Sequence, residues 1–298
     1  MSTQNQALCD RASAASPGLR LKQWDLLELA AEGTWAQIYR ARPANTRGTP
    51  QGAYALKLLR ARWQNDPRAI ALLRREAQVG RVVAHPHLVA VLGASVRLGP
   101  HFLVMPWLTG RTLRAQLEAA GALAVHKALA IGRQVTSALG ALDQAGWSHG
   151  DVKPGNVFLS PEGHVTLLDL GFARRAGEEC STADRGLLGT ADYLAPELLS
   201  SRLCGDVRSD VYSLGVVLYE ALAGRRPFVA HDLADLATQQ RTVVPPRLET
   251  LAPHVPDAVA HLVHRMLAKD PLRRPFPAEE LRRELTRLEI DALAAWLR

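Results

Sequence analysis

Apolar and polar positions divide the chain into an N-terminal part with strand-like segments and a C-terminal part with helical periodicity. Between residues 24 and 106 the apolar segments are short, and polar turn-forming residues separate them. One helix is predicted over residues 67–84, because Pro67 suits a first helical turn. The apolar segment 101–108 predicts a buried strand that ends at Pro106.

Beyond residue 108 the pattern changes to the 3.6-residue period of amphipathic helices. The segments predicted to be helical are 111–120, 126–145, 209–223, 231–240, 256–268 and 278–295. Residues 1–20 are small and polar, and we expect a flexible tail there. The predicted architecture is α+β, with a small β-rich lobe (about 21–106) and a larger, mainly helical lobe (about 107–298). Clefts between such lobes are common ligand sites.

Composition narrows the class of protein. The chain has 298 residues, of which 47% are hydrophobic and 22% charged, as in ordinary soluble globular proteins. Its formal net charge of +7 comes mainly from arginine, which favours acidic partners. The arginines form no dense run and aromatic residues are only 5% of the chain, so no nucleic-acid partner is expected.

Neither a membrane segment nor an export signal is predicted. The N-terminus lacks a charged start followed by an apolar stretch. The longest apolar stretch, 211–223, is interrupted by polar residues and is shorter than the about 20 residues that span a bilayer. Cys9, Cys180 and Cys204 share no CxxC spacing, so neither a zinc site nor a disulfide framework is indicated. We therefore predict a cytoplasmic protein.

A carboxylate interrupts the apolar face of the predicted helix 67–84. Leu72, Val79 and Val83 form a stripe on this face, and Glu76 lies within it. A carboxylate that faces a core is costly unless a cation meets it. The alternative is a long side chain that reaches solvent.

The candidate cation for Glu76 is Lys57, which ends a predicted strand over residues 53–57. Strand alternation places Ala53, Ala55 and Lys57 on one face. Small residues on that face leave room for a flat ligand, with the ammonium group at its far end.

A second group of polar residues lies in a loop over residues 149–156. Its glycines and proline exclude regular structure, and it carries Asp151, Lys153 and Asn156 within six residues. A predicted strand follows and ends at Asp169. Two carboxylates and an amide that converge on one cleft suit Mg²⁺, which prefers oxygen ligands. A lone Asp-Xaa-Gly is usually only a turn. Asp169 is a candidate ligand because the loop that carries Asp151 and Asn156 precedes it.

These motifs, in this order, resemble those of the eukaryotic-type (Hanks-type) serine/threonine protein kinases, as found in bacteria, over about residues 24–288. Asp169-Leu170-Gly171 stands where the family has Asp-Phe-Gly. Further resemblances lie at 189–197, at 209–215 and at 270–275, where the family arginine is Arg274 and its partner Glu197. Any one of these motifs is weak, whereas the set in order is highly specific.

The resemblance implies the bilobal protein-kinase fold and transfer of the ATP γ-phosphoryl group to Ser or Thr hydroxyls of proteins. Asp151 would accept and orient the hydroxyl proton, and Lys153 would neutralise charge on the moving group. Asn156 and Asp169 would hold Mg²⁺. Lys153 and Thr190 together imply Ser/Thr rather than Tyr specificity.

The resemblance also implies a nucleotide site in which Lys57, locked by Glu76, binds the α- and β-phosphates. The remaining positions it implies are Ala31, Gly33, Ile38, Ala55, Met105, Pro106, Leu108, Phe158 and Asp169. Met105 would be the gatekeeper beside the adenine. Pro106 can offer only its carbonyl, and Leu108 can donate its N–H.

Two departures from the family pattern concern the nucleotide side. The three positions of the glycine-rich loop read Ala31, Gly33 and Ala36, and alanine resists positive φ, so we expect weaker ATP binding. Gly80, four residues after Glu76, replaces a bulky residue of the family's hydrophobic spine. We expect that replacement to loosen the helix.

A third departure is Gly150, which replaces the arginine before Asp151 and makes the catalytic loop non-RD. The resulting His-Gly-Asp is found in small-molecule phosphotransferases related to aminoglycoside and choline kinases, one alternative class. Lys153, Thr190 and Arg274 favour the protein kinase. A pseudokinase-type binding scaffold is the other alternative, and the filled charged positions argue against it. The oligomeric state is not indicated.

The segment 209–223 is apolar on nearly every side and is predicted to be a buried helix. Ser209 or Asp210 is expected to cap its start and Gly224 to close its end. By the resemblance, Asp210 also braces the backbone of the catalytic loop.

Overall fold

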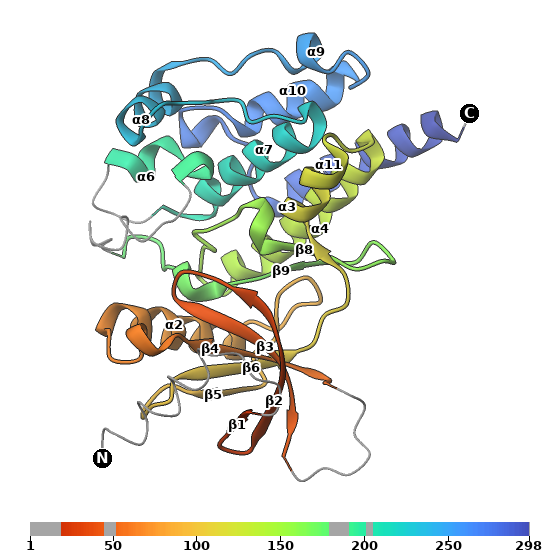
Figure 1. The fold of residues 1–298 in the computed structure, drawn as a ribbon. Helices are drawn as coiled ribbons and strands as arrows, with labels where there is room; N and C mark the ends of the chain where they lie inside the picture. The colour runs from red at the N-terminus through yellow and green to blue at the C-terminus, as the bar shows by residue number, and fades with distance from the viewer. Residues whose placement is uncertain (1–18, 45–51, 179–190, 201–204, 298) are drawn as a thin grey trace. The chain divides into compact units, whose positions relative to one another are not determined.

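A computed structural model of the chain describes residues 19–44, 52–178, 191–200 and 205–297 (Figure 1). The described chain forms two compact units. The first ends at Ala84 and resumes over Val89–Thr109, and the second comprises His85–Leu88 and the chain from Gly110 onward. The division is thus more interleaved than one boundary near residue 106.

The first unit is built on an antiparallel sheet with the strand order β1-β2-β3-β4-β6-β5. Its strands are β1 (Leu19–Leu21), β2 (Trp24–Glu32), β3 (Ala36–Pro43), β4 (Tyr54–Leu59), β5 (Gly93–Ser95) and β6 (Phe102–Pro106). Because side chains alternate between the faces, one face buries a cluster that includes Tyr39, Leu56 and Val104. The opposite face packs against helix α2.

The start of β1 corrects the expected extent of the N-terminal tail. Leu19 and Arg20 were predicted to be flexible, but they pair with Leu26 and Asp25 of β2. A tight hairpin pairs Leu19–Leu21 with the start of β2, and this pairing extends the sheet into the segment predicted to be flexible. Residues 1–18 lie outside the described part of the chain.

Helix α2 (Pro67–Val82) begins where the sequence predicts. Asp66 caps it by accepting hydrogen bonds from two backbone N–H groups of the first turn, and Pro67 occupies the first helical position. Its buried face differs from the predicted stripe, because Leu73 is buried whereas Leu72 is only half buried. Glu76 lies on this buried face, as predicted.

The second unit is mainly helical. Its longer helices are α3 (Leu113–Ala120), α4 (Val125–Gln144), α7 (Val207–Ala223), α8 (Leu233–Thr242), α10 (Asp257–Met266) and α11 (Ala278–Trp296), and α6 (Pro196–Ser200) and α9 (Leu248–Leu251) are short (Figure 1). A small antiparallel sheet joins β7 (Arg111–Thr112), β8 (Val157–Leu159) and β9 (Val165–Leu167). Among the described residues, no helix combines the length and the apolarity that crossing a membrane requires.

Helix α7 is the buried central helix of this unit. From Val207 to Leu222 every residue except Arg208 is buried. Its cap is Asp206, whose carboxylate accepts from the N–H of Arg208, so the prediction of a cap at residue 209 or 210 is wrong. The helix begins two residues earlier than the apolar pattern suggests. Gly224 ends the helix in the left-handed region, with φ of 71°, as predicted.

The segment His85–Leu88 belongs to the second unit although its neighbours along the chain belong to the first. Leu88 forms a parallel bridge with Leu167, and the N–H of Leu167 donates to the carbonyl of His87 over 2.9 Å. The imidazole of His87 lies 2.8 Å from the carbonyl of Val165. Four residues are thus fixed to the edge of β9.

Candidate active site

Lys57 and Glu76 form the predicted ion pair inside the first unit. Lys57 Nζ lies 2.7 Å from Glu76 Oε2, and the exposed fractions of the two side chains are 15% and 2%. Helix α2 packs on the sheet through Leu73 and Ala77, against Leu59 and the rest of the same cluster. That packing turns Glu76 toward β4. A buried carboxylate of this kind requires its cation, because an unpaired charge there is costly.

The sheet register brings the other predicted nucleotide-side residues of this unit together. Ala31 pairs with Ile38, and Ile38 pairs in turn with Lys57. One row further along β4, Ala55 pairs with Met105. Lys57 and Ala55 therefore share the sheet face opposite the Tyr39 cluster, as strand alternation predicts.

Pro106 and Leu108, the hinge positions whose carbonyl and N–H the resemblance assigns to the adenine, follow shortly after Met105 along the chain. Pro106 is the last residue of β6 and pairs with Tyr54. The N–H of Trp107 donates to the carbonyl of Ala53 over 3.0 Å, and Leu108 comes next along the chain. Ala53, predicted to face the ligand with Ala55, lies before β4 and is exposed.

Two departures from the family pattern in the first unit have structural explanations: the alanine at a glycine position, Ala36, and the glycine at a bulky position, Gly80. Ala36 is 7% exposed and is part of the core cluster beneath α2, so its Cβ is used in packing. At Gly80 a Cβ atom would lie 2.5 Å from Cγ2 of Val91, which fills the space. The helix is therefore packed at Gly80, and Glu76 keeps its contact with Lys57.

In the second unit, the backbone of the catalytic loop is held by Asp210, as the resemblance implies. The N–H groups of His149 and Gly150 donate to the Asp210 carboxylate over 2.6 and 2.8 Å. Burial raises the pKa of Asp210 to about 7, against the opposing effect of these two hydrogen bonds. Its side chain comes from the first turn of α7, so the central helix positions the loop.

His149 is a positioning residue that the sequence reasoning did not identify. It is fully buried, and burial lowers its pKa to about 4, so its imidazole is neutral. Nδ1 accepts from the N–H of Asp151 at 3.2 Å, and Nε2 lies 3.0 Å from the carbonyl of Leu168. The only sequence signal is its place two residues before Asp151.

Asp151 is the buried carboxylate of this loop. Lys153 Nζ lies 2.7 Å from its Oδ2, and Asn156 Nδ2 donates to the same atom over 2.8 Å. Burial raises the pKa of Asp151 to about 6, opposed by the charge of Lys153 and reinforced by that of Asp169. A carboxylate with a pKa near neutrality is suited to act as a general base.

Asn156 and Asp169 lie on neighbouring segments. Asn156 precedes β8, and its carbonyl accepts from the N–H of Leu168 over 2.8 Å. Asp169 follows β9 with φ of 64°, so it leaves the strand, and its carboxylate accepts from Gly171 N–H. Strand alternation therefore does not extend to Asp169. Phe158 lies in the middle of β8.

The donor chemistry of this pair fits Mg²⁺. Asn156 uses its NH₂ group for Asp151, which leaves the amide oxygen for a cation, and Asp169 supplies a carboxylate. Mg²⁺ commonly takes one or two protein oxygens and completes its coordination with phosphate and water. Among the described residues no cluster of three or more His, Cys, Asp or Glu side chains forms a metal site.

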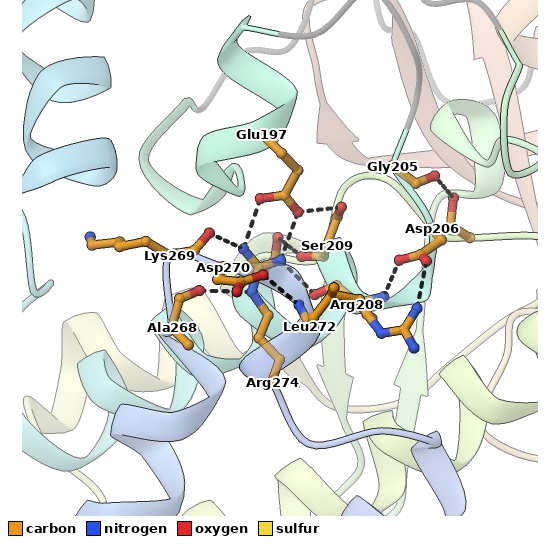
Figure 2. Close-up of polar contacts among 12 residues, drawn as sticks. Glu197, Gly205, Asp206, Arg208, Ser209, Ala268, Lys269, Asp270, Leu272 and Arg274 are labelled. Atoms are coloured by element: carbon orange, nitrogen blue, oxygen red, sulfur yellow. Dashed lines mark hydrogen bonds and ion pairs between the residues drawn. The ribbon is translucent and has the colours of Figure 1, made fainter.

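Glu197 and Arg274 form the second predicted ion pair, and it is bidentate (Figure 2). Arg274 Nη1 and Nη2 lie 2.6 and 2.7 Å from the two carboxylate oxygens. Ser209 donates to the same carboxylate over 2.7 Å. Burial favours the neutral acid, but the hydrogen bonds and charge of Arg274 lower the pKa of Glu197 below its usual value. The pair ties α6 to the start of α7 and to the chain before α11.

A third polar group was not predicted. The Tyr193 hydroxyl donates to Glu220 Oε2 over 2.5 Å and contacts the guanidinium of Arg114, which itself lies 3.1 Å from Glu220. These residues come from separate elements with no shared motif, so local sequence carries no signal for them. Thr190, named by the sequence reasoning, lies outside the described residues.

Comparison with known proteins identifies the family. A model of the protein kinase domain matches residues 25–285. The chain therefore belongs to the protein kinase family, and the predicted α+β kinase fold is confirmed. The predicted resemblance to bacterial Hanks-type serine/threonine protein kinases is confirmed by the relatives that the chain matches.

Three of these relatives illustrate the similarity. Serine/threonine-protein kinase PrkC of Bacillus subtilis (strain 168) is 32% identical over 240 residues, covering 80% of this chain and 37% of PrkC. PknB of Mycolicibacterium smegmatis is 34% identical over 276 residues, covering 89% of this chain and 43% of PknB. PknA of Mycobacterium tuberculosis (strain CDC 1551 / Oshkosh) is 34% identical over 257 residues, covering 85% of this chain and 58% of PknA. The chain thus spans only about 37–58% of the length of these relatives.

Proposed function

We propose that this protein is a serine/threonine protein kinase that transfers the γ-phosphoryl group of ATP to Ser and Thr hydroxyls of proteins. The observation that carries the proposal is the environment of Asp151, a buried carboxylate with a pKa of about 6 that contacts both Lys153 and Asn156. We assign the kinase domain to the chain from β1, which begins at Leu19, two residues before the start of the predicted range 21–298. The Ser/Thr preference is assigned to Lys153 together with Thr190.

In this proposal, Asp151 accepts the proton of the substrate hydroxyl as the hydroxyl oxygen attacks the γ-phosphorus. The bond from that phosphorus to the β–γ bridging oxygen breaks, and ADP leaves. Lys153 stabilises the negative charge that develops on the transferred group. Asp210 and His149 keep the loop in place through its backbone. Most of the rate enhancement therefore comes from positioning and electrostatics.

On the nucleotide side, Lys57 binds the α- and β-phosphates and Glu76 fixes its ammonium group. Mg²⁺, held by Asn156 and Asp169, neutralises phosphate charge when it is bound. We assign the adenine to Ala55, Met105 and Phe158. The Pro106 carbonyl and the Leu108 N–H are assigned as its hinge partners.

Gly150 makes the proposed catalytic loop non-RD, because it offers no cation to a phosphate on the activation segment. The same glycine is the feature shared with small-molecule phosphotransferases. The Glu197–Arg274 pair favours the protein kinase over that alternative, since it organises the segment that follows Thr190. A pseudokinase-type scaffold would have the same fold without turnover.

The test is phosphorylation of casein and myelin basic protein with Mg²⁺ and ATP, with choline and an aminoglycoside as other acceptors. Asp151→Asn and Asp169→Asn should each lower the rate by about 10²–10³-fold, as loss of about 3–4 kcal/mol of transition-state stabilisation predicts. The control is the exposed Asp291→Asn, which should keep wild-type activity. Phosphorylation of choline or the aminoglycoside alone, or of no acceptor, would contradict the proposal.

The pH profile tests the role of Asp151 independently. A base with a pKa of about 6 is protonated below that pH, so kcat/KM should fall as the pH drops through about 6. Because burial favours the neutral carboxyl, Asp151→Asn should be at least as stable as wild type at pH 7.5, and this difference should vanish toward pH 4. An Asp151→Asn protein that melts well below wild type would show that lost activity reflects unfolding.

A further inference from the structure

The tip of the β2–β3 hairpin is held by the segment that follows β4. The backbone carbonyl of Thr34 accepts hydrogen bonds from the indole Nε1 of Trp63 at 2.8 Å and from the guanidinium of Arg62 at 3.3 Å. The carbonyl of Gly33 accepts one from the guanidinium of Arg60 at 3.2 Å. We call Arg60, Arg62 and Trp63 the loop clamp.

Aromatic stacking reinforces the loop clamp. The ring centroids of Trp35 and Trp63 are 4.3 Å apart, and the guanidinium of Arg62 lies 5.4 Å from the Trp63 ring centroid. The carbonyl of Trp35 accepts from the backbone N–H of Arg60 over 2.9 Å. One exposed hydrogen bond stabilises a loop only slightly. Here several contacts restrain the same three loop residues, so their effects combine.

The loop clamp is itself anchored to the sheet through the buried Gln64. Its Nε2 donates to the carbonyl of Leu59 over 2.7 Å, and its Oε1 accepts from the N–H of His101 over 2.8 Å. Gln64 therefore joins the end of β4 to the residue before β6. The loop clamp is fixed relative to Lys57, which lies on the same strand β4.

The loop clamp determines the direction of the loop amides. In a trans peptide the carbonyl and the following N–H point to opposite sides. Because the carbonyls of Gly33 and Thr34 point toward the clamp, the N–H groups of Thr34 and Trp35 point away from it. Backbone N–H groups of such loops bind phosphate oxygens, and a loop that is already ordered loses less entropy on binding.

We propose that the loop clamp preorders these amides for the phosphates of ATP, and that it thereby offsets the missing glycines at Ala31 and Ala36. The inference rests on the proposed function, since it assumes that ATP is the ligand. Arg60, Arg62 and Trp63 are positioning residues in this proposal, because they act through the backbone of the loop.

Trp63→Phe tests the proposal, because it removes the indole N–H and keeps an aromatic ring beside Trp35. The matched control is Trp24→Phe in the same unit, since the buried Nε1 of Trp24 has no hydrogen-bond partner in the described structure. Calorimetric titration with Mg²⁺–ATP should give an about fivefold higher Kd for Trp63→Phe. Adenosine, which lacks phosphates, should bind both variants as it binds wild type.

A second variant, Arg60→Met, removes the guanidinium contacts with the carbonyl of Gly33 and with the Glu32 carboxylate, 2.9 Å away at the end of β2. It should give a smaller loss of the same kind, in ATP affinity alone. An equal loss of affinity for ATP and for adenosine, or an equal loss of ATP affinity in Trp63→Phe and Trp24→Phe, would overturn the proposed role of the loop clamp. An unchanged ATP affinity in both Trp63→Phe and Arg60→Met would overturn it too. If wild type bound no ATP, the proposed function itself would fail, and the two failures are thus distinguishable.

Discussion

At the scale of single residues, Gly150 is required by its own backbone conformation. Its φ is +77°, and a Cβ atom would lie 2.5 Å from the carbonyl oxygen of Phe172. Both features exclude ordinary side chains. The absence of an arginine before Asp151 is therefore built into the local fold, and restoring that arginine would distort the loop.

Gly150→Ala should lower the free energy of unfolding by about 1–3 kcal/mol, because it combines a strained φ with a close backbone contact. The matched control is Gly155→Ala in the same loop, where no atom lies within 4 Å of the added Cβ. Urea unfolding measures both. Equal stability of the two variants would contradict the explanation.

The sequence pattern predicted which charged residues pair more accurately than it predicted which face of a helix or strand a residue occupies. Glu76 stood out because it is a carboxylate among apolar positions, and its pairing with Lys57 at 2.7 Å is confirmed. The buried face of α2 was assigned to Leu72 in place of Leu73, because small buried residues such as Ala77 add little to a hydrophobic pattern. The left-handed φ of Asp169 has no signal in alternation.

At the scale of elements, each segment predicted to be helical contains a helix, and the errors lie at the ends. Helix α3 begins at Leu113 because Arg111 and Thr112 pair with β8 instead. Strands β1 and β5 were not predicted, because each is only three residues long, too short to show an alternating pattern. Short helices such as α9 are likewise invisible to a 3.6-residue period.

Arg274 provides the sharpest test of how the helices are tied together. Its side chain is fully buried, and besides Glu197 it donates to the carbonyls of Arg208, Ala268 and Lys269. Arg274→Ala should destabilise the protein by about 3–5 kcal/mol, because it leaves Glu197 as an unpaired, largely buried carboxylate.

The control for Arg274→Ala is the adjacent Arg273→Ala. The Arg273 side chain is 81% exposed, and its nearest carboxylate contact is 3.7 Å long, so its loss should change stability little. Guanidinium unfolding of both variants gives the comparison. Similar losses for the two neighbours would show that the bidentate pair does not hold these elements together.

At the scale of the whole molecule, the family and the class of fold were predictable because many motifs occur in order, whereas the interleaving of the two units was not. Regulation also belongs to this scale. By the resemblance, Ser181 and Thr182 are the candidate phosphorylation sites of the activation segment, and they lie outside the described residues.

Arg174, Arg175 and Arg185 are the nearby cations that could replace the missing arginine. Arg174 is buried and donates to the carbonyls of Gly171 and Ala173. The guanidinium of the exposed Arg175 lies 4.7 Å from the Trp147 ring centroid, and Arg185 lies outside the described residues.

We therefore expect that phosphorylation of the activation segment does not switch the enzyme on. A charge-assisted contact orders such a segment only where a cation is available, and Gly150 supplies none. The Ser181→Ala/Thr182→Ala double variant and phosphatase-treated wild type should keep activity within about tenfold of untreated wild type, or about 1.4 kcal/mol in barrier. A larger fall in both would show that phosphorylation is required.

The docking of His85–Leu88 on β9 has a consequence for synthesis on the ribosome. The partners of this segment, Val165 and Leu167, emerge almost 80 residues later. During translation the first unit can complete its sheet before the partners of these four residues have been synthesised. Folding of the second unit must then recruit a peptide from inside a domain that has already formed. The first unit can therefore fold before the second is complete, but no single cut of the chain separates the two units.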